Sequence, residues 1–208
     1  VGEQPGGPQK LTETYNGTAW TEVGDTNTAR PNAGAGAGTT TAGLCYGGGT
    51  NNNESWNGTS WSEIANVNHT GTQAGGLGTQ TAAMYVGGSP ATADSETWNG
   101  TSWAEGGNIN TARYGLIGAG STTAGIVSGG PGVGNGYVET YDGSTWTETT
   151  DLNTARFQAM GAQNAPSSAV LVAAGGPPNK TNTELWNGSA WTEVADISYA
   201  RNQGGGGG

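Results

Sequence analysis

The chain carries few charged residues, and very few of them are basic. Only 11% of its 208 residues are charged, with six Lys or Arg against sixteen Asp or Glu, and the formal net charge is −10. Proteins bind nucleic acid by neutralising its phosphates with Lys and Arg, and anionic membrane surfaces attract basic segments for the same reason. The composition therefore argues against nucleic acid and against an anionic membrane surface as partners.

Cysteine and histidine are almost absent. Cys45 is the only cysteine, which excludes an intrachain disulfide and a cysteine metal site. His69 is the only histidine, and because one imidazole cannot form a zinc site without partners, we interpret it as a loop residue. No metal or cofactor is expected. No apolar run is long enough to cross a bilayer, so insertion into a membrane is not expected either.

Glycine and tryptophan are abundant instead, and one motif that contains both recurs five times. It spans residues 12–22, 54–63, 96–105, 139–148 and 184–193, reading TETYNGTAWTE, ESWNGTSWSE, ETWNGTSWAE, ETYDGSTWTE and ELWNGSAWTE. The closing tryptophans lie 41 to 45 residues apart. A fixed aromatic motif at such a period is typical of propellers and solenoids, whose units bury their apolar faces only by stacking on neighbours. We interpret residues 1–208 as a single domain of this kind.

Each repeat reads as four short strands. In residues 30–68 these are RPNAGAGAG, TTTAGLCY, the segment 53–56 and SWSEIANV. Asn57-Gly58, between the last two, is typical of a two-residue type I′ hairpin turn, in which both residues have positive φ. That turn predicts Tyr15 opposite Thr18 and Glu13 opposite Trp20 in the first repeat. There is no helical periodicity, and four strands per repeat make a propeller blade.

The ends of the chain predict how the blades are joined. The first strand of each repeat is rich in Gly and Ala, as in Ala33–Gly38, Gly75–Gly78 and Gly118–Gly120, which favours five blades around a narrow axis. The C-terminal stretch from Arg201 aligns with the inner strand that begins at Arg30. We therefore predict an all-β fold: a five-bladed β-propeller with four antiparallel strands per blade, closed by pairing of N- and C-terminal strands. Closure of this kind leaves no free sheet edge.

The repeated acids and aromatics are interpreted as structural. A glutamate lies seven residues before and another two residues after each closing tryptophan. Paired carboxylates can act as general acid and base, but a fivefold copy favours a solvated or Arg-paired role. Arginine follows the motif in four repeats, and we expect ion pairs or carbonyl contacts between blades from it, whereas the second repeat has Gly71. We assign the eight tryptophans to packing between blades, with a ring of sugar-stacking platforms as the alternative.

The segments that vary between repeats are the candidate binding sites. The stretch between the Gly-Gly pair and the motif changes in length and sequence, and variable loops on a rigid scaffold commonly carry function. These loops are expected to share one face with the N-T-A-R connectors, opposite the tight Asn-Gly turns. The candidate ligand contacts are Asn51, Asn52, Asn53, Asp94, Asn135, Asn179 and Asn182 in the loops, and Asn27, Asn110 and Asn153 in the connectors.

These motifs resemble two known groups of proteins. A Gly-Gly pair that ends an apolar strand, followed by an aromatic residue and a tryptophan, is similar to the kelch pattern. The form WNGTSW with N-T-A-R and Thr/Gly-rich inner strands resembles repeats in structural and tail-fibre-like proteins of marine bacteriophages, especially cyanophages. Galactose oxidase shares the kelch fold, but its copper site needs histidines and a Tyr–Cys pair that this chain lacks.

The resemblance implies a component of a virion appendage, at the virion surface or outside the cell. The leading hypothesis is a non-catalytic propeller that displays binding loops towards a host-surface glycan or other virion proteins. The alternatives are a multivalent lectin with one sugar site per blade and a purely structural protein without a small ligand. An enzyme ranks last, because the sequence shows no nucleophile, base and orienting group in a recognisable arrangement.

Overall fold

The computed structural model describes residues 3–4, 7–30, 32, 34–130 and 136–206, and these residues form β-strands and loops. Their strands make four sheets of four antiparallel strands each and two sheets of two strands. None of the described residues forms a helix of the length and apolarity that crossing a membrane requires. The predicted all-β fold with four antiparallel strands per repeat is confirmed for four of the five repeats.

The sheets follow the repeats in order. Sheet 1 is the hairpin β3 (Thr12–Tyr15) and β4 (Trp20–Val23), preceded by the ribbon β1 (Glu3–Gln4) and β2 (Gly7–Pro8). Sheet 2 contains β5 (Ala35–Gly38), β6 (Gly43–Tyr46), β7 (Asn53–Trp56) and β8 (Trp61–Ile64). Sheet 3 contains β9 (Gly75–Gly78), β10 (Ala83–Val86), β11 (Ser95–Trp98) and β12 (Trp103–Glu105). Sheet 4 contains β13 (Ile117–Ser121), β14 (Ala124–Ser128), β15 (Val138–Tyr141) and β16 (Trp146–Glu148). Sheet 5 contains β17 (Met160–Gly161), β18 (Leu171–Ala173), β19 (Thr183–Trp186) and β20 (Trp191–Val194).

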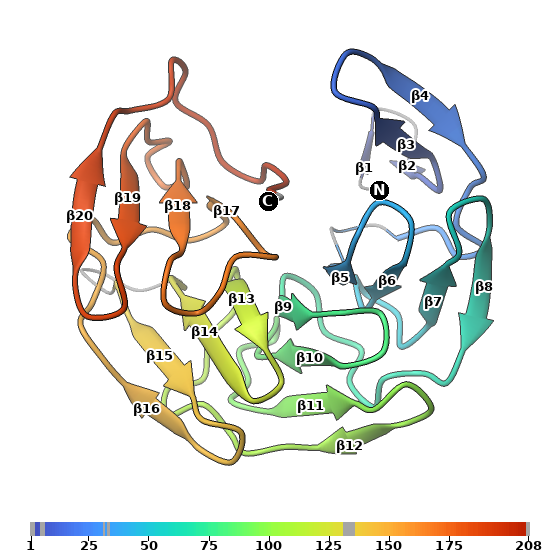
Figure 1. Ribbon diagram of the computed structural model, residues 1–208, viewed down its shortest axis with the longest axis horizontal. Coiled ribbons are helices and arrows are strands. Elements are labelled where there is room, and N and C mark those ends of the chain that lie inside the picture. Colours follow the sequence, from blue (N-terminus) through green and yellow to red (C-terminus); the bar gives the residue numbers. More distant parts are fainter. Residues whose placement is uncertain (1–2, 5–6, 31, 33, 131–135, 207–208) are drawn as a thin grey trace.

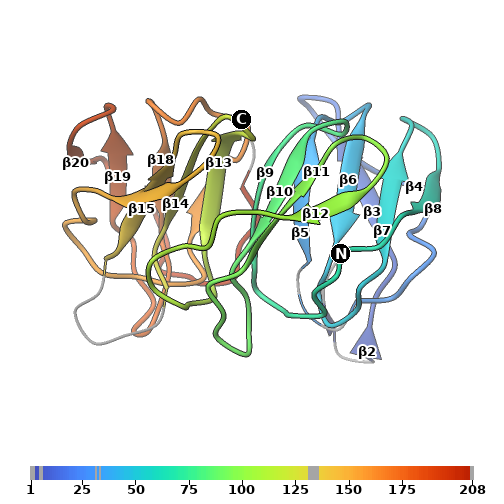
Figure 2. The ribbon, with the colours of Figure 1, turned by 90° about the horizontal axis from the view of Figure 1, so that it is seen from below.

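The sheets are arranged around a common centre like the blades of a propeller (Figure 1). In sheets 2 to 5 the first strand lies nearest the centre and the fourth lies at the rim, and the strands run between the two faces of the molecule (Figure 2). The inner strands contact one another in chain order, β5 with β9, β9 with β13 and β13 with β17.

Glycine is required where the inner strands meet. A Cβ atom on Gly76 would lie 2.6 Å from the carbonyl oxygen of Gly36, and one on Gly118 would lie 2.6 Å from that of Gly76. These are backbone atoms of the neighbouring sheet, so they cannot turn aside as a side chain would. The glycine content thus has the predicted cause, the close approach of inner strands.

The hairpin between the third and fourth strands differs from the prediction. Its loop has four residues, so Tyr15 pairs with Trp20 and Glu13 with Glu22. The φ angle is positive at Gly17, whereas Asn16 is not among the residues with positive φ. Asn16 instead accepts the N–H groups of residues 18 and 19 on its Oδ1 atom, each at 2.9 Å. The predicted type I′ turn and its register were therefore wrong, because the asparagine side chain closes a longer turn of the Asx type.

The longer turn places each aromatic residue beside the closing tryptophan. Their ring centroids lie 4.9 to 5.5 Å apart in all five hairpins. Most of these rings are buried between sheets, as in the contact of Trp103 with Tyr46 of the preceding sheet, where the centroids are 5.0 Å apart. The tryptophans at the interfaces of sheets 2 to 5 therefore pack between blades, which was the preferred interpretation of these residues.

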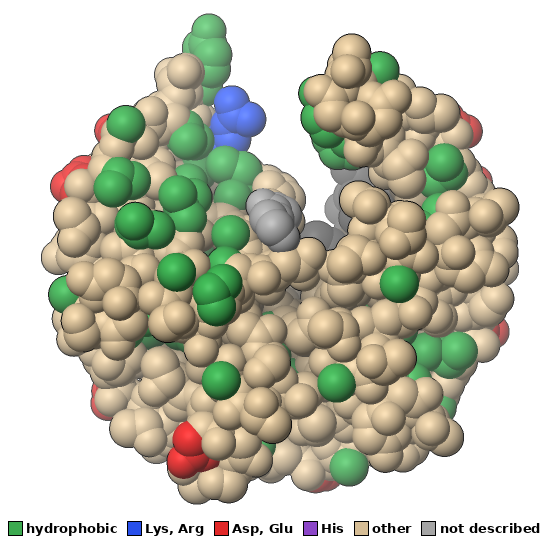
Figure 3. All heavy atoms as spheres, in the orientation of Figure 1, with side chains coloured by type: hydrophobic (Ala, Val, Ile, Leu, Met, Phe, Trp, Pro, Cys, Tyr) green, Lys and Arg blue, Asp and Glu red, His purple; other side chains and the backbone are tan. Residues whose placement is uncertain are grey.

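The two ends of the chain are the exception to this regularity. Sheet 1 has two strands, and the described residues Gly204–Gly206 lie outside any strand. A notch separates sheets 1 and 5 on the face shown in Figure 3. Among the described residues there is no pairing of N- and C-terminal strands, so closure of the ring stays a prediction.

Candidate functional site

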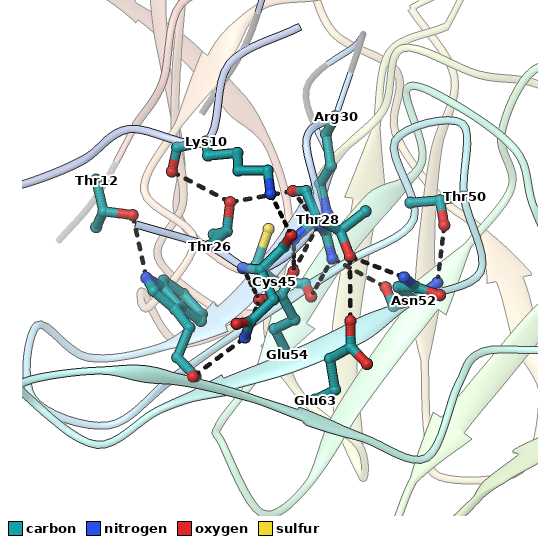
Figure 4. Close-up of polar contacts among 12 residues, drawn as sticks. Lys10, Thr12, Thr26, Thr28, Arg30, Cys45, Thr50, Asn52, Glu54 and Glu63 are labelled. Carbon is teal, nitrogen blue, oxygen red and sulfur yellow. Dashed lines mark hydrogen bonds and ion pairs between the residues drawn. The ribbon is translucent and has the colours of Figure 1, made fainter. Parts of the chain in front are cut away.

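The first glutamate of each motif in sheets 2 to 5 is bound by the connector that leads in from the preceding sheet. Glu54 accepts the N–H groups of Asn27 and Thr28, the amide of Asn27 and the guanidinium of Arg30 (Figure 4). Arg30 Nη1 lies 3.0 Å from Glu54 Oε1, and both side chains are fully buried. Arg30 also donates to the carbonyl groups of Cys45 and Asn52. We call this arrangement, a motif glutamate with the connector residues that bind it, a clasp.

The clasp recurs with an arginine at two further interfaces. Arg113 binds Glu139 at 2.7 Å, and Arg156 binds Glu184 at 2.5 Å, with at most 2% of each side chain exposed. Burial lowers the pKa of both arginines, and the facing glutamates oppose this shift. In each clasp the connector asparagine also donates to the glutamate through its N–H and its amide. The predicted Arg pairing of the repeated glutamates is thus present at three interfaces.

The interface between sheets 2 and 3 has a different clasp. Glu96 accepts the N–H of His69, and His69 Nδ1 lies 2.8 Å from Glu96 Oε1, while Nε2 lies 2.8 Å from Asp94 Oδ2. Burial lowers the pKa of His69, but the hydrogen bonds and charges of Glu96 and Asp94 raise it more, so the net shift is upward. Thr92 and His69 hold the pKa of Asp94 below its ordinary value.

A tyrosine explains why this clasp has no arginine. Tyr85 occupies the strand position opposite Glu96, where sheet 2 has Cys45 and sheets 4 and 5 have valine. A Cβ atom on Gly71, the residue in the arginine position, would lie 2.6 Å from the hydroxyl of Tyr85. The Tyr85 ring therefore fills the space that an arginine side chain needs, and the hydroxyl itself is buried without a hydrogen-bond partner.

At the two ends of the chain the halves of a fifth clasp are exposed. Glu13 of sheet 1 is exposed, whereas the equivalent glutamates of sheets 2 to 5 are buried. Arg201 is exposed as well, although it pairs through its backbone with Lys180. Trp20 is 66% exposed, against 6% for Trp191. These residues are of the types that form the clasps and the packing between the other sheets, but no described sheet covers them.

The candidate ligand residues fall into three groups. Asn27, Asn110 and Asn153 are exposed in part but bind the clasp glutamates, so their amides are engaged within the molecule. Asn52, Asn53, Asp94 and Asn182 have hydrogen bonds to Thr28, Ala65, His69 and Glu193 respectively. Asn51 is half-buried and Asn179 is exposed at a loop tip, whereas Asn135 lies outside the described residues.

An open groove lies between sheets 2 and 3, on the side of the molecule that carries the Asn-Gly turns. Its volume is about 440 Å³, and it is lined by Ser55, Ile64, Ala65, Gln80, Thr81, Trp98, Gly100 and Thr101. Gly100 and Thr101 belong to the Asn-Gly hairpin turn of sheet 3. Gln80 crosses the interface and donates to Ser55 and to the carbonyl of Trp56. The groove thus offers hydroxyl groups, with the buried Trp98 beneath them.

Sequence reasoning missed the partners of His69. Asp94 and Glu96 lie 25 and 27 residues further along the chain and on the next sheet, so only the fold brings them to the imidazole. A signal was present, because His69, Gly71 and Asp94 all depart from the repeat in the same interface.

Comparison with known proteins identifies the fold alone. No protein-family model matches the chain, and no curated protein does. The solved structure of YjhT is similar, with a TM-score of 0.67 and 13% sequence identity over 82% of this chain and 67% of that chain. At this identity the likeness concerns the propeller-like arrangement of sheets and carries no statement about activity.

Proposed function

We propose that the protein is a non-catalytic β-propeller scaffold that presents its variable loops for binding, as a component of a bacteriophage virion appendage. The observation that supports the non-catalytic role is the clasp. It engages the motif glutamates of sheets 2 to 5, three arginines and the histidine in contacts between sheets. Among the described residues, the ring of His69 bonds to carboxylates and to no hydroxyl or thiol. The placement in a virion rests on the sequence resemblance, with a host-surface glycan or other virion proteins as the expected partners.

The groove favours one alternative, a carbohydrate-binding lectin. The hydroxyl groups of Ser55, Thr81 and Thr101 line it above the buried Trp98, and such polar groups suit the hydroxyl groups of sugars. This alternative places the ligand between two sheets, near the Asn-Gly turns. The leading proposal places it on the loops of the other face.

Three substitutions at exposed positions separate these two sites. We expect Ala91→Arg and Asn179→Arg, on the loops, to reduce binding to host cells at least about tenfold, because a bulky charged side chain removes contact area from a weak, shallow site. Thr101→Arg, at the groove, serves as the matched control and should leave that binding unchanged. Binding is measured with labelled protein on bacterial cells and on an array of microbial glycans. Loss with Thr101→Arg alone would favour the lectin. No binding to cells or glycans would contradict both the lectin and a host-surface glycan as the partner of the loops.

We further propose that the ring is closed as a five-bladed propeller. The C-terminal segment supports this, because it continues the pattern of the other connectors. Gln203 has positive φ, as do Gln73 and Gln158 at the equivalent positions. Its N–H donates to the carbonyl of Gln158 at 2.8 Å, just as the N–H of Gln158 donates to Gly115. A Cβ atom on Gly206 would clash with the carbonyl oxygen of Gly161, as one on Gly118 would with the carbonyl oxygen of Gly76.

The sides of sheets 5 and 1 that face the notch carry exposed residues whose equivalents are buried elsewhere. Leu171 of sheet 5 is 39% exposed, whereas Ile126, its equivalent in sheet 4, is 1% exposed. On sheet 1, across the notch seen in Figure 3, Trp20 and Glu13 are exposed, and no described sheet covers them. A contact between these flanks would bury the apolar residues and let Arg201 bind Glu13 as Arg156 binds Glu184.

Chemical cross-linking tests the closure. Tyr199 and Glu22 stand where Thr28 and Glu63 stand at the first interface, and there the two side chains approach to 3.5 Å. In a Cys45→Val background, we expect a short bis-maleimide to join Tyr199→Cys to Glu22→Cys within one chain. The matched control is the pair Thr28→Cys and Glu63→Cys, and the products are read by mass spectrometry after gel filtration. Cross-links only between chains, or none where the control pair reacts, would show that sheets 1 and 5 do not meet within one molecule.

A further inference from the structure

The clasp between sheets 2 and 3 has an excess of negative charge. The other three clasps contain an arginine, which is positively charged at any ordinary pH. Here the arginine position is Gly71, and the position two residues before the motif glutamate, which is Asn52 in sheet 2 and Asn182 in sheet 5, is Asp94. One permanent cation has therefore been removed and one carboxylate added, with His69 as the remaining group that can carry positive charge.

The carboxylates are grouped around the imidazole. His69, Glu96 and Glu105 each offer one ligand atom, and these atoms lie within 4.8 Å of one another. Glu96 and Glu105 are directly opposite on β11 and β12, where like charges destabilise a pair of strands unless a cation lies near them. Glu105 is exposed, and no hydrogen bond to its side chain is present among the described residues.

The imidazole is oriented for a ligand role. His69 Nε2 faces Asp94, which is itself bound by the Thr92 hydroxyl and the Asn108 amide. A carboxylate that accepts the N–H of one ring nitrogen fixes the tautomer and leaves the other nitrogen free to bind a metal. That other nitrogen, Nδ1, lies 2.8 Å from the Glu96 carboxylate, a hydrogen-bond distance that a shared proton satisfies. The two atoms must separate by about 0.5 Å to bind one metal ion together.

A second, independent feature lies beside this cluster. The Tyr85 hydroxyl is fully buried and has no hydrogen-bond partner among the described residues. Its ring stacks on His69, with centroids 6.2 Å apart and planes 14° from parallel. Buried hydroxyl groups almost always have a partner. An unpaired one next to the clasp leaves a donor for a further polar group there, such as a water molecule held by an ion.

We propose that this clasp is a binding site for one divalent transition-metal ion of the Zn²⁺ class. His69 Nδ1 and the carboxylates of Glu96 and Glu105 are the ligands, and Asp94 orients the imidazole. Imidazole and carboxylate are ligands that Zn²⁺ accepts in protein sites of four ligands, and water supplies the fourth position. The ion takes the role that arginine has in the other clasps: it neutralises the buried glutamate and joins sheet 3 to the connector from sheet 2.

Thermal unfolding with and without metal tests the proposal. The full chain is treated with EDTA, dialysed, and titrated with ZnCl₂ or with MgCl₂. We expect Zn²⁺ to raise the melting temperature by about 5–10 °C at about 100 times its dissociation constant. Mg²⁺ should have no effect, because it prefers oxygen ligands over imidazole. Calorimetric titration should give one ion per chain.

The repeats supply matched variants that keep the fold. His69→Thr introduces the residue found at this position in the three other clasps, Thr28, Thr111 and Thr154, and it should abolish the Zn²⁺-dependent shift. Asp94→Asn introduces the residue of sheets 2 and 5, and it should weaken Zn²⁺ binding about 10–100-fold. Glu63→Gln, at the position in sheet 2 equivalent to Glu105, is the control and should bind as the native chain does.

Three outcomes would overturn the proposal. The first is an unchanged melting temperature of the native chain at millimolar ZnCl₂. The second is an equal Zn²⁺ shift in His69→Thr, which would place the ion elsewhere. The third is an equal response to Mg²⁺, which would exclude an imidazole ligand. Because both variants are compared by calorimetric titration as well as by unfolding, a variant that is merely less stable is distinguished from one that has lost the ion.

Discussion

Replacing Arg156 with methionine is expected to lower the free energy of unfolding by about 3–5 kcal/mol, the usual cost of removing one partner from a buried ion pair. Arg156 is 2% exposed, and it binds Glu184 as well as the carbonyl groups of Ala174 and Asn182. The substitution keeps the volume of the side chain but leaves the Glu184 charge buried beside a connector that offers only neutral donors.

A double-mutant cycle isolates the pair. Glu184→Gln removes the charge that Arg156 neutralises, so Arg156→Met combined with Glu184→Gln should cost less than the sum of the two single changes. Glu193→Gln is the control, because this glutamate is exposed on the neighbouring strand β20 and should alter stability by less than about 0.5 kcal/mol. The measurement is urea unfolding followed by tryptophan fluorescence. A loss below about 1 kcal/mol for Arg156→Met, or strict additivity in the cycle, would mean that the clasp does not hold the sheets together.

The general fold could be predicted from the sequence because its causes are local and repeated. Asn-Gly turns, Gly-rich inner strands and the aromatic pair each occur in every repeat or nearly so, and each marks the same turn, strand or packing position in successive repeats. The pairing of Arg30 with Glu54 could also be expected, since an arginine and a glutamate at fixed spacing in successive repeats must face each other once the sheets stack. The hairpin register could not, because it depends on the Asn16 side chain accepting two N–H groups rather than on backbone angles.

The candidate site was harder to predict, because it depends on departures from the repeat. Asn27, Asn110 and Asn153 were proposed as ligand contacts on the basis of their loop position, yet their amides bind clasp glutamates of the next sheet. His69 looked isolated because its partners Asp94 and Glu96 belong to another sheet. Gly71, Tyr85 and Asp94 all depart from the repeat at this interface. The structure explains them together, because the Tyr85 ring fills the space that an arginine at position 71 would need.

Substituting alanine for Gly118 is expected to destabilise the protein by about 1–3 kcal/mol or more, as overpacking of a close-packed interior does. The added methyl would lie 2.6 Å from the carbonyl oxygen of Gly76 and 3.1 Å from its carbonyl carbon, so the inner strands β9 and β13 must separate. Gly205→Ala is the matched control: a Cβ atom there meets nothing within 4 Å, and Ile117 stands at the equivalent position of sheet 4. Thermal unfolding should show a clear fall for Gly118→Ala and none for Gly205→Ala.

Gly36→Ala, the equivalent substitution on the inner strand β5, tests whether the ring is closed. A Cβ atom on Gly36 meets only the carbonyl oxygen of Leu44, at 3.3 Å and within its own sheet, because no inner strand precedes β5 among the described residues. In a closed five-bladed ring, the inner strand of sheet 1 would approach Gly36 as β5 approaches Gly76. Gly36→Ala should then cost about as much as Gly118→Ala, about 1–3 kcal/mol. A nearly neutral Gly36→Ala beside a destabilised Gly118→Ala would show that the centre of the ring is open at that point, and an unaffected Gly118→Ala would contradict the close approach of the inner strands itself.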